Sequence, residues 1–292
     1  MAHTQNIANS WAAWFPHIGN NLKVIDLTDS NLVTVDSSIA RRMVDLNFIS
    51  LSHNPNIEKN SVVELLKTEN FIDRLKFLHI SNITANFKNL PLDQIIDHSN
   101  NISLIELNIS NNNYSNMDLN TFLFNQVKFK TLQSFSAANN FLERCSDPLI
   151  SIDTTLLPNL ETLDVSYNNL TGSSCFYPIR LCHNLQTLDL SHNRIKMFHS
   201  DLVSNGLVGI FGDMTNLSYI DLSHNRITEL MLSFTPYHTK LEKFDVSHNN
   251  LYSFRFLSQH KVKSSNFPLN LEVTLILFHL FLIRQFFSNL SL

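Results

Sequence analysis

The stretch that decides the fold is Asn-Leu-Gln-Thr-Leu-Asp-Leu-Ser-His-Asn-Arg-Ile at residues 184–195. Closely similar residues return at 216–227 and, more loosely, at 240–251. Each copy follows the pattern L-x-x-L-x-L-x-x-N-x-L, with apolar residues at positions one, four and six and asparagine at position nine. A short unit of this kind cannot bury its apolar side alone. Its repetition therefore predicts an array in which each unit packs on its neighbours.

Nine units can be traced along the chain, with spacings of 24 to 32 residues. Alternate side chains of a strand leave opposite faces, so positions one, four and six are expected to share one core. The asparagine at position nine is expected to bond the backbone of the turn through its amide. The units begin at Leu22, Leu46, Leu75, Leu104, Leu132, Leu160, Leu185, Leu217 and Leu241. The position-nine asparagines are Asn54, Asn112, Asn140, Asn168, Asn193, Asn225 and Asn249, with Ser30 and Ile83 in the two remaining units.

This pattern is identified as that of leucine-rich repeats. The resemblance implies an α/β solenoid, or horseshoe, with a parallel sheet on its concave side and an irregular or short-helical convex side. Among the connectors, Ser61-Val-Val-Glu64 has the form of a capping box and predicts a short convex helix after it. Residues 117–124 and 201–211 are weaker helix candidates.

The chain divides into three parts. Residues 22–270 hold the array, and residues 1–21 are expected to be either the end of an earlier repeat or an apolar cap. Residues 271–292 lose the repeat pattern, and their apolar run is broken by His279 and Arg284 well before the roughly 20 residues that a membrane helix needs. This tail is interpreted as a truncated or alternatively spliced end, with a membrane anchor as the alternative. The first residues do not show a secretory signal.

Composition argues against several function classes. The formal net charge is -4 and there is no basic run, so a nucleic-acid surface is not indicated. With 5 glycines and no phosphate-binding loop, a cofactor site is not expected. Asp189, Ser191 and His192 have the composition of a hydrolase triad, but they lie on one strand and turn, so an enzyme is not expected.

The three cysteines do not form a metal motif, and no metal site is expected. Cys145 and Cys175 follow their repeat starts at similar distances, so they can face one another on adjacent units. A disulfide between them is a hypothesis that requires an oxidising compartment. A bridge between Cys175 and Cys182, or three free thiols, are the alternatives.

The residues between the core leucines are expected to line the concave side in columns, one residue per repeat. Position five carries Asp in five units, position seven carries mostly Ser, and position eight carries His53, Tyr167, His192, His224 and His248. These columns predict an acidic, hydroxyl-rich strip flanked by histidines, which would bind a basic or polar protein partner and respond to pH between about 7.5 and 5.5. The alternative is that these residues are solvated surface positions of the repeat and bind nothing. The candidate ligand-binding residues are Asp164, Tyr167, Asp189, His192, Tyr219, Asp221, His224, Asp245 and His248.

Sequons for N-glycosylation are frequent in the chain, although a sequence so rich in Asn, Ser and Thr yields some by chance. A sugar on Asn108 would occupy the concave face and exclude docking there. The other candidate sites are Asn82, Asn101, Asn113, Asn169 and Asn216, and a further sequon stands at Asn289 in the tail.

The repeated Leu-Asp-Leu-Ser-His-Asn-Arg-Ile and the irregular spacings over residues 22–251 resemble the ectodomains of Toll-like receptors. The resemblance implies a protein or microbial ligand, a receptor dimer, and an extracellular, cell-surface or endosomal location. The cysteine-rich caps, membrane span and TIR segment of that family are not seen here, so a receptor fragment is expected. The alternative is a cytoplasmic repeat scaffold that assembles other proteins.

Overall fold

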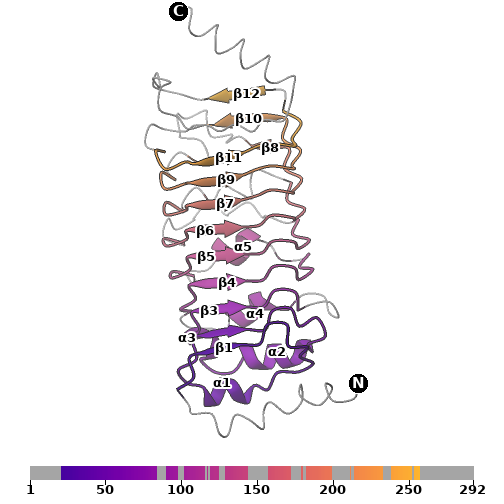
Figure 1. Cartoon of the computed structure of the whole chain (residues 1–292), viewed down its shortest axis with the longest axis vertical. Helices are drawn as coiled ribbons and strands as arrows, with labels where there is room; N and C mark the ends of the chain where they lie inside the picture. Colours follow the sequence, from indigo (N-terminus) through magenta and orange to yellow (C-terminus); the bar gives the residue numbers. More distant parts are fainter. Residues whose placement is uncertain are drawn as a thin grey trace, which may run out of the picture.

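A computed structural model describes residues 21–83, 90–97, 102–115, 117, 119–124, 129–143, 157–171, 179, 182–198, 211, 214–232, 238–251 and 253–256. Within these residues, nine strands form one sheet that runs the length of the array (Figure 1). All of its neighbouring pairs are parallel. In spatial order the strands are β1 (Val24–Asp26), β2 (Phe48–Ser50), β3 (Phe77–His79), β4 (Glu106–Asn108), β5 (Ser134–Ser136), β6 (Thr162–Asp164), β7 (Thr187–Asp189), β9 (Tyr219–Asp221) and β11 (Lys243–Asp245).

The register of the sheet matches the repeat pattern unit by unit. Leu163 pairs with Leu188, and Leu188 pairs with Ile220, so position four stacks above position four. Each strand covers positions three to five of its unit. The predicted leucine-rich-repeat solenoid is confirmed, because the strands begin two residues after each of the nine predicted start leucines.

The core is a continuous strip behind the sheet. Leu185, Leu188 and Leu190, at positions one, four and six of the seventh unit, are fully buried, and equivalent residues of the other units join the same cluster. Burial of one such leucine side chain contributes about 1.5–3 kcal/mol relative to exposure. The sheet face turned away from this core is called the open face below.

The position-nine asparagines join adjacent units. The Asn193 amide nitrogen donates to the carbonyl oxygens of Leu190 and Ser191 in its own turn and to Val165 of the preceding unit, at 3.1, 3.2 and 3.0 Å. Its side-chain oxygen accepts the N–H of Leu170 at 3.0 Å. Asn168, Asn225 and Asn249 repeat this arrangement. The hydrogen bonds expected between each asparagine amide and the backbone of its turn are present, and further ones join it to the preceding unit.

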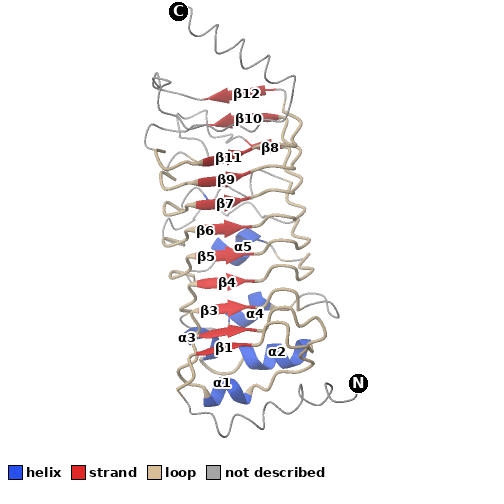
Figure 2. Cartoon of the chain, in the orientation of Figure 1, coloured by secondary structure: helices blue, strands red, loops and turns tan. Residues whose placement is uncertain are grey.

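The described helices lie among the connectors, mainly toward the N-terminal end of the array (Figure 2). Buried residues of these helices belong to the same core cluster as the strand leucines, so they cover the side opposite the open face. The helices are α1 (Ser38–Arg42), α2 (Lys59–Leu66), α3 (Phe71–Arg74), α4 (Leu92–Asp97) and α5 (Leu119–Phe124).

The capping-box prediction is wrong in detail. Helix α2 begins at Lys59, two residues before Ser61, and its N-cap Glu58 makes no side-chain cap hydrogen bond. The Ser61 hydroxyl instead donates to the Glu58 carbonyl at 2.8 Å and accepts the Val35 N–H at 3.2 Å. The helix predicted at 117–124 is observed as α5. The candidate at 201–211 lies outside the described residues except for Phe211.

A second parallel sheet forms in the connectors of the last three units, where the sequence predicted an irregular or short-helical side. Its strands lie in the order β12 (Ser253–Phe256), β10 (Glu229–Leu232) and β8 (Met197–Phe198). Each strand begins four residues after its turn asparagine. Because the three strands begin at the same distance from their turn asparagines, they lie in register and their main chains pair.

The ends of the chain are not part of the described structure. The predicted N-terminal segment, apart from Asn21, and the tail at 271–292 lie outside the described residues, so both assignments stay predictions. Among the helices that are described, none combines the length and apolar character that crossing a bilayer requires.

Candidate ligand-binding surface

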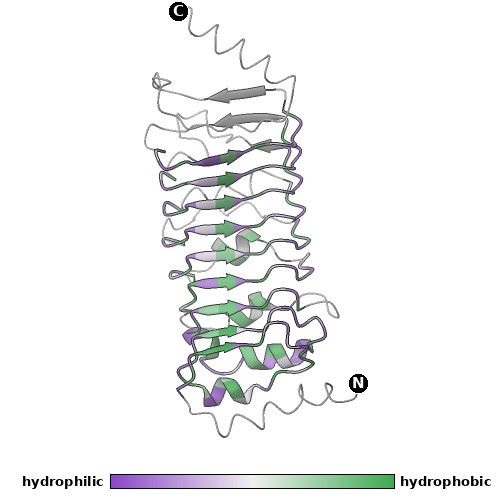
Figure 3. Cartoon of the chain, viewed as in Figure 1, coloured by the Kyte–Doolittle hydropathy of each residue, from purple (hydrophilic) through white to green (hydrophobic). Residues whose placement is uncertain are grey.

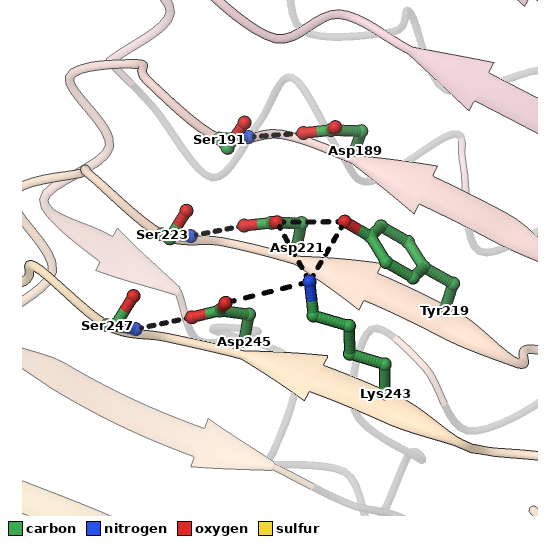
Figure 4. A network of polar contacts seen from close by, with 8 residues as sticks. All are labelled: Asp189, Ser191, Tyr219, Asp221, Ser223, Lys243, Asp245 and Ser247. Carbon is green, nitrogen blue, oxygen red and sulfur yellow. Dashed lines mark hydrogen bonds and ion pairs between the residues drawn. The ribbon is translucent and has the colours of Figure 1, made fainter. Parts of the chain in front are cut away.

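Four aspartates line up on the open face at the C-terminal end of the sheet, and Figure 4 shows Asp189, Asp221 and Asp245 among them. Asp164, Asp189, Asp221 and Asp245 occupy position five of β6, β7, β9 and β11, and each pairs in register with the next. Neighbouring strands lie about 4.8 Å apart, so the carboxylates form one row across four strands. These four residues, with Tyr219 and Lys243 at position three, are called the acidic strip.

Each aspartate of the strip also has a structural role. One carboxylate oxygen accepts the N–H of the serine two residues later, at 3.0 Å for Asp164 and 2.9 Å for Asp189, Asp221 and Asp245. Such a hydrogen bond closes a turn and ends the strand. Asn108 makes the same bond to Ser110 at 3.0 Å. An acidic charge is therefore not required for the turn.

Charge is unevenly balanced along the strip. Lys243 Nζ lies 4.0 Å from Asp221 and 3.8 Å from Asp245, and it also contacts the Tyr219 hydroxyl at 3.4 Å. These contacts hold the pKa of Lys243 above its usual value, with the hydrogen bond to Tyr219 as the largest cause. Within the described part of the chain, no salt bridge neutralises Asp164 or Asp189. One cation thus faces four carboxylates.

Burial raises the pKa of Asp189, and repulsion from Asp164 and Asp221 on the flanking strands adds to that effect. Hydrogen bonds from Ser191 act in the opposite direction. The Asp189 carboxylate is therefore held in an unfavourable charged state at neutral pH. A Lys or Arg side chain of a partner would relieve this repulsion.

The serines at position seven differ from the prediction. Ser166, Ser191 and Ser223 are buried, with relative exposures of 5, 5 and 6%. The strands end at position five, so alternation of side chains between two faces does not extend to position seven. The open face is consequently acidic but not hydroxyl-rich at these three units.

The position-eight residues lie on the turns that follow the strands, at one edge of the sheet and not among the strand side chains. Tyr167, His192, His224 and His248 all have left-handed backbone, with φ of 53, 54, 53 and 54°. Their rings stack in sequence with centroid distances of 4.0, 4.1 and 4.0 Å. This set is called the ring column, and the prediction that it lines the concave strand face is corrected to the sheet edge.

An apolar patch at the other end of the open face was not foreseen. Val24, Phe48 and Phe77 stand at position three of β1, β2 and β3 and pair in register. Val24 is 54% exposed, and the two phenylalanine rings lie 6.0 Å apart. Figure 3 shows these three strands mostly in green, whereas β11 begins in purple. The signal was available in the sequence as a column of apolar residues at position three.

The apolar patch ends at a polar pair. His79 packs its ring edge against Phe48, with centroids 5.2 Å apart. His79 Nε2 lies 2.9 Å from Glu106 Oε1 on the next strand. Position three of the open face therefore changes from apolar to polar between β3 and β4, whereas position five is polar on both sides of this boundary.

The predicted modification sites have different environments. Asn113 is exposed, Asn169 and Asn216 are partly exposed, and the Asn82 amide contacts His53 Nδ1 at 3.2 Å. Asn101, Cys145 and Cys175 lie outside the described residues. Cys182 is a buried free thiol, and burial raises its pKa to about 12. The described residues do not contain three or more His, Cys, Asp or Glu side chains arranged for a metal ion.

Comparison with known proteins agrees with this architecture. Leucine-rich-repeat family models match residues 157–176, 181–196 and 216–236. No curated protein sequence matches the chain at a significant level. The fold and the matched repeats of this chain are those of leucine-rich repeats, and the comparisons do not single out Toll-like receptors.

Solved structures with a similar fold include three repeat proteins. The plant peptide hormone receptor RGFR1, in complex with RGF2, matches with a TM-score of 0.51 and 19% identity over 81% of this chain and 33% of its own. The leucine-rich repeat domain of APL1B matches with a TM-score of 0.48 and 16% identity, over 78% of this chain and 62% of its own. The Arabidopsis thaliana receptor kinase GASSHO1/SCHENGEN3, in complex with CASPARIAN STRIP INTEGRITY FACTOR 2, matches with a TM-score of 0.47 and 19% identity, over 78% of this chain and 27% of its own. The chain thus spans about a third of the RGFR1 structure.

Proposed function

We propose that this chain is a non-enzymatic recognition module that binds a protein or peptide partner across the open face of its sheet. The observation that carries the proposal is the arrangement of two surfaces of opposite character on one sheet, each made mainly of partly exposed side chains. The acidic strip covers β6 to β11, and the apolar patch covers β1 to β3. A flat surface with both charge and apolar groups is suited to a peptide-like partner.

The two surfaces define the chemistry of the partner. Lys or Arg side chains would pair with Asp164 and Asp189, where no lysine of the described chain competes. Aliphatic or aromatic side chains would cover Phe48 and Phe77. Strands β3 and β6 are three spacings apart, or about 14 Å. An extended segment covers this distance with about four to five residues. The expected partner therefore carries basic and apolar groups separated by about that many residues.

The structural comparison supports a peptide or protein partner. RGFR1 has the same fold and is described as a peptide hormone receptor in complex with RGF2. A protein with this fold can therefore serve as a peptide hormone receptor. The residues that would bind a peptide here are those of the acidic strip and the apolar patch.

As a finer proposal, the module is part of a Toll-like receptor ectodomain, outside the cell or in an endosome, as the resemblance of residues 22–251 suggests. An intracellular scaffold is the second candidate, favoured by the buried free thiol of Cys182. Mass spectrometry of the protein from its native cells separates the two. A sugar on Asn113 supports the receptor, whereas an unmodified Asn113 together with reduced cysteines supports the scaffold.

The binding proposal is tested by calorimetry with a synthetic ten-residue peptide that has a Lys-Arg pair and a Leu-Phe pair four residues apart. Double substitution Asp189→Asn/Asp221→Asn removes two charges and keeps both turns, as Asn108 shows. We expect at least about tenfold weaker binding, as for loss of charge-assisted hydrogen bonds.

The matched control is Asp29→Asn/Asp45→Asn, which removes two exposed carboxylates away from the strip. This variant should bind within about twofold of the natural protein, since exposed charges at that distance are largely screened. Equal losses in the two double variants would show general charge attraction and not a site. Failure of the peptide to bind the natural protein at millimolar concentration would reject the proposal.

A further inference from the structure

A shallow groove of about 480 Å³ runs along the edge of the sheet, outside the open face. One wall is formed at position eight by Asn139 and by Tyr167, His192 and His224 of the ring column. The other is formed at position ten by Phe141, Asn169, Arg194 and Arg226 in successive units. The buried position-nine asparagines lie between the two walls. The acidic strip and the apolar patch do not contribute to its lining. We call this feature the edge groove.

The two central rings of the ring column, His192 and His224, present only their edges to the groove. His192 stacks on Tyr167 and His224, and His224 stacks on His192 and His248, so both faces of these two rings are covered. The backbone fixes each ring in place, because Tyr167, His192 and His224 donate their N–H groups to the carbonyl of the following unit at 3.0 Å. The edge of a histidine ring carries two ring nitrogens, which can bind polar groups.

The opposite wall contributes two fixed positive charges. Arg194 and Arg226 are exposed, and among the described residues neither guanidinium has a salt bridge. A guanidinium presents several donors in a planar fork that fits a carboxylate. An acidic residue, Glu143, lies beside Asn169 with an Oε1 to Nδ2 distance of 3.2 Å. Two cations and a line of histidine edges therefore share one groove.

We propose that the edge groove is a second binding site, for an acidic peptide segment whose Asp or Glu carboxylates pair with Arg194 and Arg226 and contact the edges of His192 and His224. Charge complementarity selects this partner, since the groove is cationic whereas the acidic strip on the open face is anionic. A nucleic acid is less suited to it, because the faces of the two central rings are already stacked and cannot receive bases.

Protonation of the ring column would strengthen this site. His224 is surrounded by His192 and His248 in the column, by Asp221 and Asp245 on the strands and by the arginines of the groove wall. Burial and then the two histidines lower the pKa of His224, and the two aspartates act in the opposite direction. An acidic segment would add negative charge on the groove side. Binding would then take up protons and become tighter as pH falls from 7.5 to 5.5.

The test is calorimetric titration with a hexaglutamate peptide at pH 7.5 and pH 5.5. We expect binding that is at least about fivefold tighter at pH 5.5, while the glutamates remain largely ionised at that pH. Replacement of His192 and His224 by Asn should remove most of this pH dependence. Asn tolerates the left-handed backbone, and the chain itself uses Asn82, Asn111 and Asn139 at this position.

The charged wall is tested with Arg194→Gln/Arg226→Gln, which should weaken hexaglutamate binding at least about tenfold. The matched control is Arg41→Gln/Arg42→Gln, two exposed arginines at the C-terminal end of helix α1. Circular dichroism should show that both variants fold. Equal weakening by both pairs would overturn the site.

Two other results would also overturn the proposal. The first is hexaglutamate affinity that is the same in the Asn variant and the natural protein at both pH values. The second is Arg194- and Arg226-dependent binding of a thymidine oligonucleotide with no binding of hexaglutamate, which would indicate a phosphate partner instead.

Discussion

The two ends of the open face differ in chemistry although their backbones are the same. At β1 to β3, position three carries Val24, Phe48 and Phe77, whereas β6 to β11 carry a row of aspartates at position five. Both ends keep the same parallel register and a buried residue at position four. The comparison shows that the framework and the binding surface occupy different positions of the repeat, so one can change without the other.

The connectors behind the sheet differ in the same way. Helices α1 to α3 follow the first two units, while extended strands β8, β10 and β12 follow the last three (Figure 2). The core remains continuous behind both. What the repeat requires is apolar burial and satisfied backbone groups, and either a short helix or a second sheet can supply these.

The largest effect is expected from the shared core. Leu188→Ala, under the acidic strip, and Leu78→Ala, under the apolar patch, each remove a fully buried side chain at position four. Each should lower the free energy of unfolding by about 2–5 kcal/mol because each leaves a cavity. Urea unfolding followed by circular dichroism measures both. Losses that differ by more than about 2 kcal/mol would show that the two ends are packed differently.

The next effect tests the asparagine framework. Asn193→Ala removes the hydrogen bonds from Asn193 to Leu190, Ser191 and Val165, and leaves their carbonyl oxygens without this donor. We expect a loss of about 2–3 kcal/mol, as for a buried polar network that loses one member. Asn250→Ala is the matched control, since Asn250 is exposed at position ten. A loss in the control as large as in Asn193→Ala would contradict the assigned role.

The sequence predicted what depends on periodicity and missed what depends on where the strands end. Leu163, Leu188 and Ile220 could be placed in the core because the repeat fixes their spacing. Ser191 and His192 were placed on the concave face by extending strand alternation beyond position five. In the structure, the hydrogen bond from Ser191 to Asp189 ends the strand there, and the chain then turns.

The candidate sites were predicted only in part for the same reason. The aspartates were correctly aligned because position five is the last strand residue. The ring column required knowledge of left-handed backbone at position eight, which histidine and tyrosine do not signal by themselves. Phe48 and Phe77 were readable at position three. The strands β8, β10 and β12 depend on pairing between distant connectors, which no local pattern of the sequence reveals.

A smaller effect on stability is expected from replacing an aspartate at either end of the sheet. Burial and neighbouring carboxylates raise the pKa of Asp189, whereas hydrogen bonds from Thr28 lower the pKa of Asp26. A raised folded-state pKa means that ionisation destabilises the fold, and a lowered one means that it stabilises the fold. At pH 7, Asp189→Asn should therefore raise the melting temperature, and Asp26→Asn should lower it, each by about 1 °C.

The effect of Asp189→Asn should fade as pH falls through the raised folded-state pKa of Asp189, whereas the effect of Asp26→Asn should begin to fade only below pH 3.8, as pH falls toward the lowered folded-state pKa of Asp26. Thermal unfolding at pH 7 and pH 3 provides the check. If Asp189→Asn lowered the melting temperature at pH 7 and Asp26→Asn raised it, repulsion among the carboxylates of the acidic strip would not control the stability of the protein.

The smallest expected effect concerns the ring column in the free protein. Burial, followed by repulsion from His192 and His248, lowers the pKa of His224, so the unfolded chain takes up the proton before the folded one does. Stability should then fall as pH drops through about 6.5, and it should be retained at higher pH. His224→Asn should remove this loss of stability and raise the melting temperature at pH 5.5 by about 1 °C relative to the natural protein, with little change at pH 7.5.

His53→Asn is the matched control from the N-terminal end, where the same turn position is flanked by Asp29 and Asn82 and not by two histidines. An equal shift in the control would mean that the effect belongs to the turn and not to the stacked rings. A change in melting temperature confined to His224→Asn would show that repulsion between the stacked histidines destabilises the folded protein at low pH. An acidic segment bound in the edge groove would reduce this repulsion.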